Sequence, residues 1–114
     1  MSAEHTEARR RWADFAPLFA ALSDETRLGL MDALAATPRR SISSLADQTD
    51  FTRQAITKHL RVLEGVGLIE AQRVGRESLY AIRPGAIEDL GRDLAALSER
   101  WDERLAALKR LVED

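Results

Sequence analysis

The segment from Phe51 to Gly67 constrains the fold more than any other part of the sequence, because it has the pattern of a short helix with two different faces. Ile56, Leu60 and Leu63 recur at helical spacing and predict one buried stripe. Thr52 is a suitable N-cap residue, and the glycines at 65 and 67 can end the helix. The other face carries Arg53, Gln54, Thr57, Lys58 and Arg61, none of which is acidic. Surface helices usually mix both charge signs, so this face indicates a polyanionic partner, although a solvated face is the ordinary alternative.

A second short helix is expected directly before this segment. Ser41 begins a run of about two helical turns that ends at Thr49, and only Asp50 and Phe51 connect it to the next helix. Two short helices with such a tight connection predict a helix-turn-helix, which we place at residues 43–66.

The chain after Gly67 changes from helical to extended periodicity. Residues 68–73 and 78–82 predict two strands that flank a turn at Gly75, so residues 68–82 form a hairpin, or wing. Arg73 and Arg76 lie near its tip. Their side chains can contact phosphate or enter the minor groove, or they simply keep an exposed hairpin soluble.

Two further helices are expected before the helix-turn-helix. In the first, Trp12, Phe15, Phe19 and Leu22 share one face, and the preceding run Arg9–Arg11 is either a phosphate contact or a solvated face. The second helix is expected to start with Ser23 as its cap and to end before Pro38. Its predicted buried side consists of Leu28, Met31, Leu34 and Ala35.

Residues 86–114 read as one long helix of roughly 40 Å. Its apolar residues recur at intervals of three and four over the whole length, which is more than a small core can cover. We therefore expect a second copy of the chain to cover the outer half. The residues assigned to this dimer interface are Phe15, Phe19, Leu94, Leu97, Trp101 and Leu105. The alternative for Trp101 is that it covers the core of its own subunit.

Charge and composition narrow the function further. The net charge of the 114 residues is −2, but residues 38–83 hold eight Lys/Arg against five Asp/Glu, a local charge of +3. The chain has no cysteine, which excludes disulfides and thiolate sites. It has no long apolar run, so we expect a cytoplasmic protein without membrane contact. No nucleophile–base pair can be named, so we expect no enzyme, no catalytic residues and no cofactor.

Three segments together resemble the ArsR/SmtB family of winged-helix repressors over nearly the whole chain. They are residues 19–28 (FAALSDETRL), residues 56–69 (ITKHLRVLEGVGLI) and residues 75–80 (GRESLY). The resemblance implies a mainly α fold with a small two-stranded β-wing, in the order α-α-α-α-β-β-α, forming a homodimer. It implies a single winged-helix DNA-binding domain over residues 1–114, with residues 10–22 and 86–114 as dimerisation helices. Carried over by position, Thr52 to Arg61 would be the recognition helix, and Arg73 and Arg76 would belong to the wing.

The sequence departs from the metal-sensing members of that family. Their Cys-Val-Cys box aligns here with Ser41-Ile42-Ser43, and serine hydroxyls are poor ligands for soft metals. His5 lies in the N-terminal segment, and His59 is expected to be packed in the core rather than to bind metal. We therefore expect the branch of the family that lacks metal-ligand motifs, with no metal site.

The leading functional hypothesis is a sequence-specific regulator of transcription, implied by the resemblance to be a bacterial dimeric repressor of its own operon. Its partners would be a pseudo-palindromic double-stranded DNA operator and a second copy of the chain. The signal that releases it is expected not to be a metal, and whether it is a small-molecule inducer is not written in the sequence. The alternative is a winged-helix protein-interaction module that does not bind DNA directly.

Overall fold

The computed structural model describes residues 15–113. A helical segment at residues 15–22 is followed by the helices α2 (Glu25–Ala36), α3 (Ile42–Asp47) and α4 (Arg53–Gly65). The strands β1 (Ile69–Val74) and β2 (Glu77–Ile82) come next, and α5 (Ala86–Glu113) completes the chain. The predicted order of four helices, two strands and a last helix is confirmed. His5, Arg9–Arg11, Trp12 and the rest of residues 1–14 lie outside the described residues.

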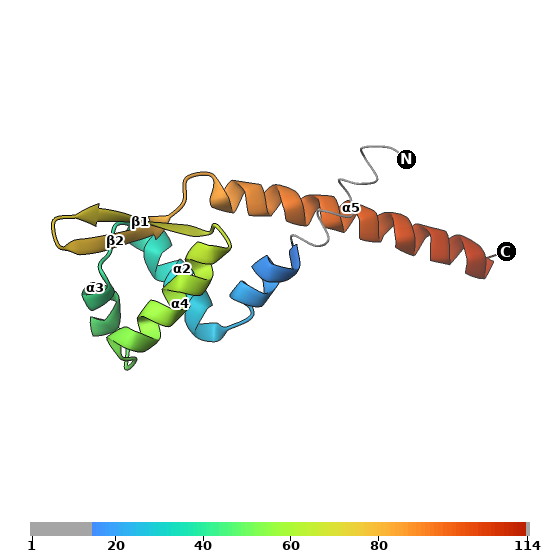
Figure 1. Ribbon diagram of the computed structural model, residues 1–114. Helices are drawn as coiled ribbons and strands as arrows, with labels where there is room; N and C mark the ends of the chain where they lie inside the picture. The colour runs from blue at the N-terminus through green and yellow to red at the C-terminus, as the bar shows by residue number, and fades with distance from the viewer. Residues whose placement is uncertain (1–14, 114) are drawn as a thin grey trace.

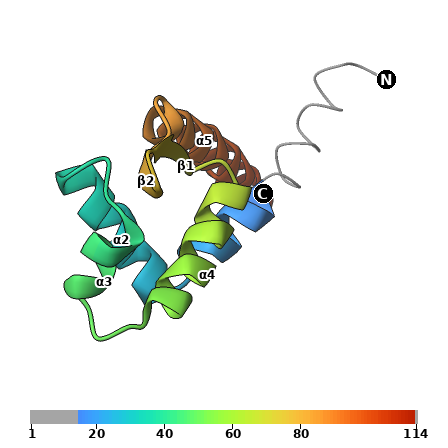
Figure 2. The same cartoon turned by 60° about the vertical axis from the view of Figure 1, so that its left-hand side comes forward.

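The helices α2, α3 and α4 and the base of the two-stranded sheet enclose one apolar core (Figure 1). Its largest fully buried side chains are Leu34, Leu45, Ile56, Leu60, Leu63 and Ile69. The three predicted stripe residues of α4 are all completely buried, which confirms the buried face of this helix. Figure 2 shows α4 in front, with α3 joined to its first turn by a short loop.

The structure corrects two predictions about α2. The N-cap is Asp24, whose carboxylate accepts the backbone N–H of Arg27 at 3.0 Å. Ser23 instead donates its hydroxyl to the carbonyl of Ala20 at the end of the preceding helix. Leu28 and Ala35 are exposed, contrary to the prediction, and the buried residues of the helix are Leu30, Met31 and Leu34. The buried side is thus rotated from the predicted one.

The ends of α3 and α4 follow local rules that the sequence makes visible. Ser41 caps α3 by accepting the N–H of Ser44, and Thr52 caps α4 by accepting the N–H of Ala55, each at 3.1 Å. The C-terminus of α4 is closed by Gly67, which has a φ of 79°. The Gly67 N–H donates to Glu64 O at 3.0 Å and the Leu68 N–H to Leu63 O at 3.1 Å. This pair of bonds is a Schellman motif, and it turns the chain from α4 into β1.

We predict opposite effects of alanine at the two glycines that end α4. Gly67→Ala should lower the free energy of unfolding by about 1–2 kcal/mol, because an L-residue is strained at positive φ. The added methyl group has room, since its nearest neighbour would be Arg83 Nε at 3.9 Å. Gly65→Ala is the matched control and should be neutral or stabilising by up to about 1 kcal/mol, because Gly65 is helical and faces open space. Urea denaturation of both variants measures the difference; equal effects would show that the left-handed conformation carries no cost.

The wing is an antiparallel hairpin whose register runs from Ile69↔Ile82 to Val74↔Glu77. Gly75 and Arg76 form the two-residue loop, and Gly75 has the positive φ of 62° that such a loop requires at its first position. The backbone of Arg40 pairs with the outer edge of β2 at Tyr80. The segment between α2 and α3 is therefore fixed to the wing.

Helix α5 leaves the wing base and extends away from the rest of the described chain (Figure 1). Its 28 residues span about 42 Å. Ala86 and Leu97 are buried, whereas the large apolar side chains beyond Leu97 are exposed. No described helix combines the length and the apolar character needed to cross a membrane.

Candidate nucleic-acid interface

The outward face of α4 brings six of the predicted DNA-binding residues together. They line a single open hollow of about 600 Å³ along the first turns of the helix. Its lining residues are Thr52, Arg53, Gln54, Ala55, Thr57, Lys58 and Arg61. No acidic residue occurs on α4 before Glu64 in the last turn. The hollow therefore presents hydrogen-bonding groups and positive charge without an internal counter-charge.

Two of these side chains also hold the helix itself. The hydroxyl of Thr52 accepts the Ala55 N–H, and the hydroxyl of Thr57 donates to Arg53 O at 2.7 Å. Thr52 keeps its O–H donor and Thr57 keeps its lone pairs for an outside partner. Lys58 and Arg61 are exposed and form no ion pair with any carboxylate among residues 15–113.

The wing arginines lie on a different element from the α4 hollow. Arg73 is on β1, and its Nε donates to Gly75 O in the loop at 3.3 Å. Arg76 is the second loop residue and is exposed. The structure thus presents the eight predicted DNA-binding residues in two groups, six on α4 and its N-cap and two on the wing.

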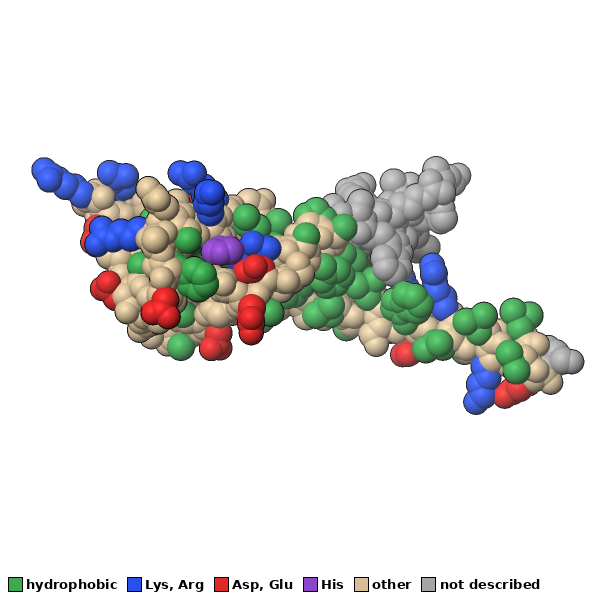
Figure 3. All heavy atoms as spheres, turned by 90° about the horizontal axis from the view of Figure 1, so that it is seen from below, with side chains coloured by type: hydrophobic (Ala, Val, Ile, Leu, Met, Phe, Trp, Pro, Cys, Tyr) green, Lys and Arg blue, Asp and Glu red, His purple; other side chains and the backbone are tan. Residues whose placement is uncertain are grey.

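On the face that Figure 3 shows, positive side chains are concentrated along one side of the compact part of the molecule, which comprises α2, α3, α4 and the wing. In Figure 3 the Lys and Arg atoms of this part gather mainly along one edge, while Asp and Glu atoms lie along the opposite edge. Six of the eight Lys/Arg residues between 38 and 83 are exposed. These are Arg39, Arg53, Lys58, Arg61, Arg73 and Arg76.

The other two basic residues of this central region bond to other parts of the chain. Arg83 donates from Nε to Gly67 O at 2.6 Å and lies 3.6 Å from Asp89, so it links the end of α4 to the start of α5. Arg40 is buried, and its guanidinium donates to Ser44 on α3 and to Gln48, the C-cap of that helix. Sequence reasoning missed Arg40, because composition does not distinguish an internal arginine from an external one.

Arg39 is a further basic residue that the sequence did not single out. It has a φ of 62°, the only positive φ of a non-glycine residue in the described chain, and its guanidinium donates to Gln72 of β1 at 3.0 Å. Non-glycine residues in this conformation are uncommon outside turns and functional segments. Because Arg39 is exposed and its guanidinium bonds β1, it adds a cation beside the wing.

His59 on α4 is partly buried against Arg27 of α2 and Phe51, and it is not part of the apolar core, contrary to the prediction. Its Nδ1 lies 3.3 Å from Arg27 Nη1 and its ring meets Phe51 edge-on, with centroids 6.4 Å apart. The same nitrogen lies 3.8 Å from a carboxylate oxygen of Asp24. The same Arg27 lies beside Asp24, where its backbone N–H and its charge hold the pKa of that carboxyl below its usual value. The cap of α2 therefore stays ionised at neutral pH.

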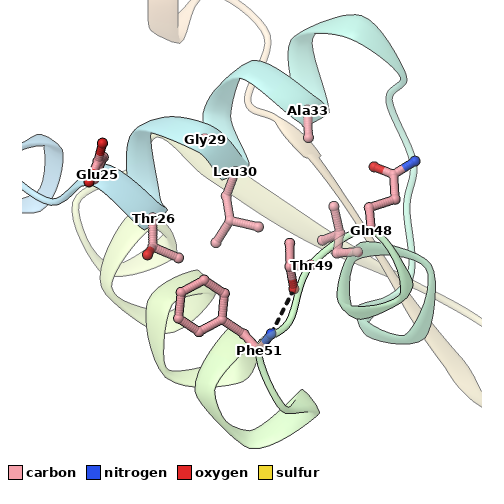
Figure 4. Close-up of a pocket in the computed structure, with 9 residues that line it drawn as sticks. Glu25, Thr26, Gly29, Leu30, Ala33, Gln48, Thr49 and Phe51 are labelled. Carbon is pink, nitrogen blue, oxygen red and sulfur yellow. Dashed lines mark hydrogen bonds between the residues drawn. The ribbon is translucent and has the colours of Figure 1, made fainter.

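A second hollow of about 420 Å³ lies between α2 and the turn that joins α3 to α4 (Figure 4). Leu30 and Leu45 form its buried floor, and the ring of Phe51 closes one side. The hydroxyl of Thr49 accepts the Phe51 N–H at 3.2 Å, which fixes the turn. None of the predicted DNA-binding residues lines this hollow, so it is separate from the one on α4.

The predicted dimer residues fall into two groups. Phe15 and Leu97 are only 4% and 8% exposed, so they are already covered within the chain and are not free for a partner. Phe19, Leu94, Trp101 and Leu105 are exposed, the last two by 53% and 59%. The exposed stripe continues to Leu108, Leu111 and Val112 near the end of α5. Trp101 is thus exposed within its own chain, and its place in a dimer interface stays a prediction.

Residues 15–113 contain no cluster of three or more His, Asp or Glu side chains arranged to hold a metal ion. Ser41 and Ser43 lie at the start of α3, and the Ser41 hydroxyl caps that helix.

Comparisons with known proteins agree with this geometry. The sequence profile of a helix-turn-helix domain matches residues 22–72. A curated transcriptional repressor SmtB homologue from a Synechocystis species is 34% identical over 80 residues, which cover 70% of this chain and 60% of the relative's length. The chain thus aligns with less than two thirds of that relative.

Solved structures cover more of the chain. An ArsR-like transcriptional regulator from Rhodococcus sp. RHA1 superimposes with a TM-score of 0.76 at 42% identity, covering 90% of this chain and 93% of that one. A homodimeric winged helix-turn-helix DNA-binding domain from Mycobacterium bovis superimposes with a TM-score of 0.64 at 28% identity, covering 92% and 91% of the two chains.

A helix-turn-helix with an exposed basic helix and an attached hairpin defines a DNA-binding winged helix-turn-helix domain of a transcriptional regulator. Such proteins are regulators and not enzymes. The 42% sequence identity with the Rhodococcus protein, over 93% of that protein's chain, specifies the family more closely. The chain belongs to the ArsR/SmtB family of winged helix-turn-helix regulators.

Proposed function

We propose that this protein is a dimeric repressor that binds a pseudo-palindromic operator, including one upstream of its own gene. The observation that supports this most directly is the α4 hollow, where six hydrogen-bonding or basic side chains point outward and no acid interrupts the first three turns. A helix of this kind fits the major groove of B-DNA. Within it, Gln54, Lys58 and Arg61 have side chains long enough to reach base edges or phosphates.

The wing would make the second contact. Arg73 and Arg76 near the loop would lie along the phosphate backbone or in the adjacent minor groove. Arg39, beside the wing, would add to the same positive surface. These contacts would position the protein on the duplex, and α4 would distinguish the sequence.

A second copy of the chain would complete the binding unit. The M. bovis domain with the same fold is homodimeric. Here the exposed apolar side chains of α5 offer a matching two-fold contact, with Phe19, Leu94, Trp101 and Leu105 as its proposed residues. A two-fold places the two α4 helices for half-sites about 34 Å apart.

The releasing signal would be something other than a thiolate-bound metal, because the chain contains no cysteine. A regulator of this type would leave its operator when the signal changes the geometry of the α4 pair.

Fluorescence anisotropy with labelled DNA from upstream of the gene, against random DNA of equal length, tests the proposal. We expect affinity for the upstream DNA to exceed that for random DNA by at least about a thousandfold at physiological salt. Equal binding to both would contradict the specific-repressor proposal. No binding to either would favour the alternative, a winged-helix module that recognises another protein.

The wing contact predicts a particular dependence on salt. If each subunit uses three or four basic side chains on phosphate, log affinity should fall with log salt at a slope of about −5 to −7. Replacing Arg73 and Arg76 by alanine should reduce the steepness by about 4 in the dimer and leave the preferred sequence unchanged. Removing Arg92 and Lys109, two exposed cations of α5, gives the same change in net charge and should leave the slope as it was. An unchanged slope in the wing variant would mean that the wing does not meet DNA.

A further inference from the structure

We propose that Arg40 is a positioning residue for DNA binding, which holds α3 against β2 and thereby fixes the angle between the wing and α4. The statement that this angle matters for DNA binding rests on the proposed DNA contact of the wing. The statement that Arg40 fixes the wing relative to α4 concerns the protein without DNA and does not depend on that contact.

Arg40 joins the two elements by two kinds of bond. Its backbone pairs with β2, since its N–H donates to Tyr80 O at 2.9 Å and the Tyr80 N–H donates to Arg40 O at 2.7 Å. Its guanidinium reaches α3 and donates to the Ser44 hydroxyl from Nε at 3.0 Å and to the Ser44 carbonyl from Nη2 at 2.9 Å. Nη1 donates to Gln48 Oε1 at 3.1 Å. One residue thus spans the gap between the wing and the first helix of the helix-turn-helix.

The surroundings of Arg40 show that its role is geometric. The residue is 8% exposed, and within residues 15–113 no carboxylate forms an ion pair with it. Burial of a cation without an anion is unfavourable, and an apolar side chain would fill such a site at lower free-energy cost. What the arginine provides is a planar fork that bonds Ser44 and Gln48 at once. Its burial also excludes direct contact with DNA.

The position of the wing tip depends strongly on the orientation of the wing, which Arg40 sets as a clamp between α3 and β2. The six-residue strand β1 places the Gly75–Arg76 loop about 20 Å from the wing base. A rotation of about 10° at the base would move the tip by about 3.5 Å, more than the length of a hydrogen bond. Arg40 holds β2 at Tyr80, opposite Ala71, and therefore partway along this lever.

The first experiment measures the orientation of the wing in the DNA-free full-length protein. Amide residual dipolar couplings of β1 and β2 are compared with those of α4 in the wild type, in Arg40→Met and in Arg39→Met. We expect the wild type and Arg39→Met to fit one rigid arrangement. The side chain of Arg39 bonds Gln72 of β1 and makes no bond to α3, so its loss leaves the link between α3 and β2 intact. In Arg40→Met the wing couplings should shrink relative to those of α4. Wing couplings that remain at their wild-type values would overturn the proposal.

The second experiment measures the coupling of Arg40 to the wing tip in DNA binding. In the wild type and in Arg39→Met, removing Arg73 and Arg76 should weaken operator affinity at least about tenfold at fixed salt. In the Arg40→Met background the same removal should cost less than about twofold, because the tip no longer reaches phosphate. A full tenfold loss in that background would overturn the positioning role, even if the wing is mobile. If the wild type does not bind DNA at all, the proposed function fails, and the dipolar couplings still decide whether Arg40 is a clamp.

Two further variants keep the test decisive if Arg40→Met folds poorly. Ser44→Ala combined with Gln48→Leu removes the side-chain acceptors and leaves the backbone pairing with Tyr80 intact. This pair should reproduce the loss of wing orientation. Arg40→Lys keeps the charge but lacks the fork, so it should give an intermediate result. Wild-type couplings in both variants would contradict the clamp.

Discussion

Replacing Lys58 and Arg61 together by alanine should remove specific operator binding while leaving the fold and the oligomeric state unchanged. Both side chains are exposed on α4, opposite Ile56, Leu60 and Leu63, which are completely buried. Each lost base contact costs about 1–3 kcal/mol, and a dimer carries two copies of each residue. Four lost contacts therefore reduce the binding free energy by at least about 4 kcal/mol, which is close to a thousandfold in the dissociation constant. Fluorescence anisotropy with operator and random DNA measures it.

The control for this variant replaces Lys109 and Arg110 of α5 by alanine. It changes the net charge by the same amount, and both residues are exposed far from α4 along the chain. It should affect long-range attraction only and leave the preference for operator over random DNA intact. A Lys58/Arg61 variant that binds DNA normally but melts at a much lower temperature would show that the two faces of α4 have been assigned the wrong way round.

Replacing Trp101 and Leu105 together by alanine should convert the dimer into a monomer. The two side chains are about half exposed or more within one chain, and a large aromatic in such a stripe typically anchors an interface. Light scattering would show the change in mass. Specific binding should fall far more than non-specific binding, because one α4 helix contacts too few base pairs to select a site.

Two comparisons make the dimer prediction specific. Glu99→Ala with Glu103→Ala alters exposed positions on the opposite side of α5 and should leave a dimer. Leu97→Ala should instead lower the free energy of unfolding by about 2–5 kcal/mol, since Leu97 is buried within its own chain. If the Trp101/Leu105 variant stays dimeric, the interface lies elsewhere, along the helical segment at residues 15–22.

The parts of the fold that depend on local rules could be predicted from the sequence. The two faces of α4, the caps Ser41 and Thr52, and the hairpin loop at Gly75 each follow from residues within one or two turns of each other. Helix α2 shows the limit. Apolar residues occur on nearly every side of it, so periodicity does not identify the buried side, and the contacts of Leu30 and Leu34 with other elements decide it.

The residues of the candidate site could be predicted in outline. Which basic residues are exposed and which bond to other parts of the chain could not. Periodicity identified Arg53, Lys58 and Arg61 as outward-facing, and the structure agrees. It could not show that Arg40 is buried or that Arg83 bonds the end of α4. The hydroxyl, carbonyl and amide oxygens that accept from these two arginines are not recognisable in the sequence as their partners. Nor could it separate Phe15 and Leu97 from their exposed neighbours, since one apolar stripe serves both the core and the outer surface.

The separation of charge seen on the compact part of the molecule affects how the protein approaches DNA. Its net charge of −2 alone would predict weak repulsion from a polyanion. On the face that Figure 3 shows, however, cations along one edge and carboxylates along the other form an electric dipole, and the field of the duplex exerts a torque on it before contact. The protein is then turned with its cationic edge toward the phosphates, while a wrongly oriented approach is repelled. Fewer encounters are unproductive, and the association rate can exceed what the overall charge suggests.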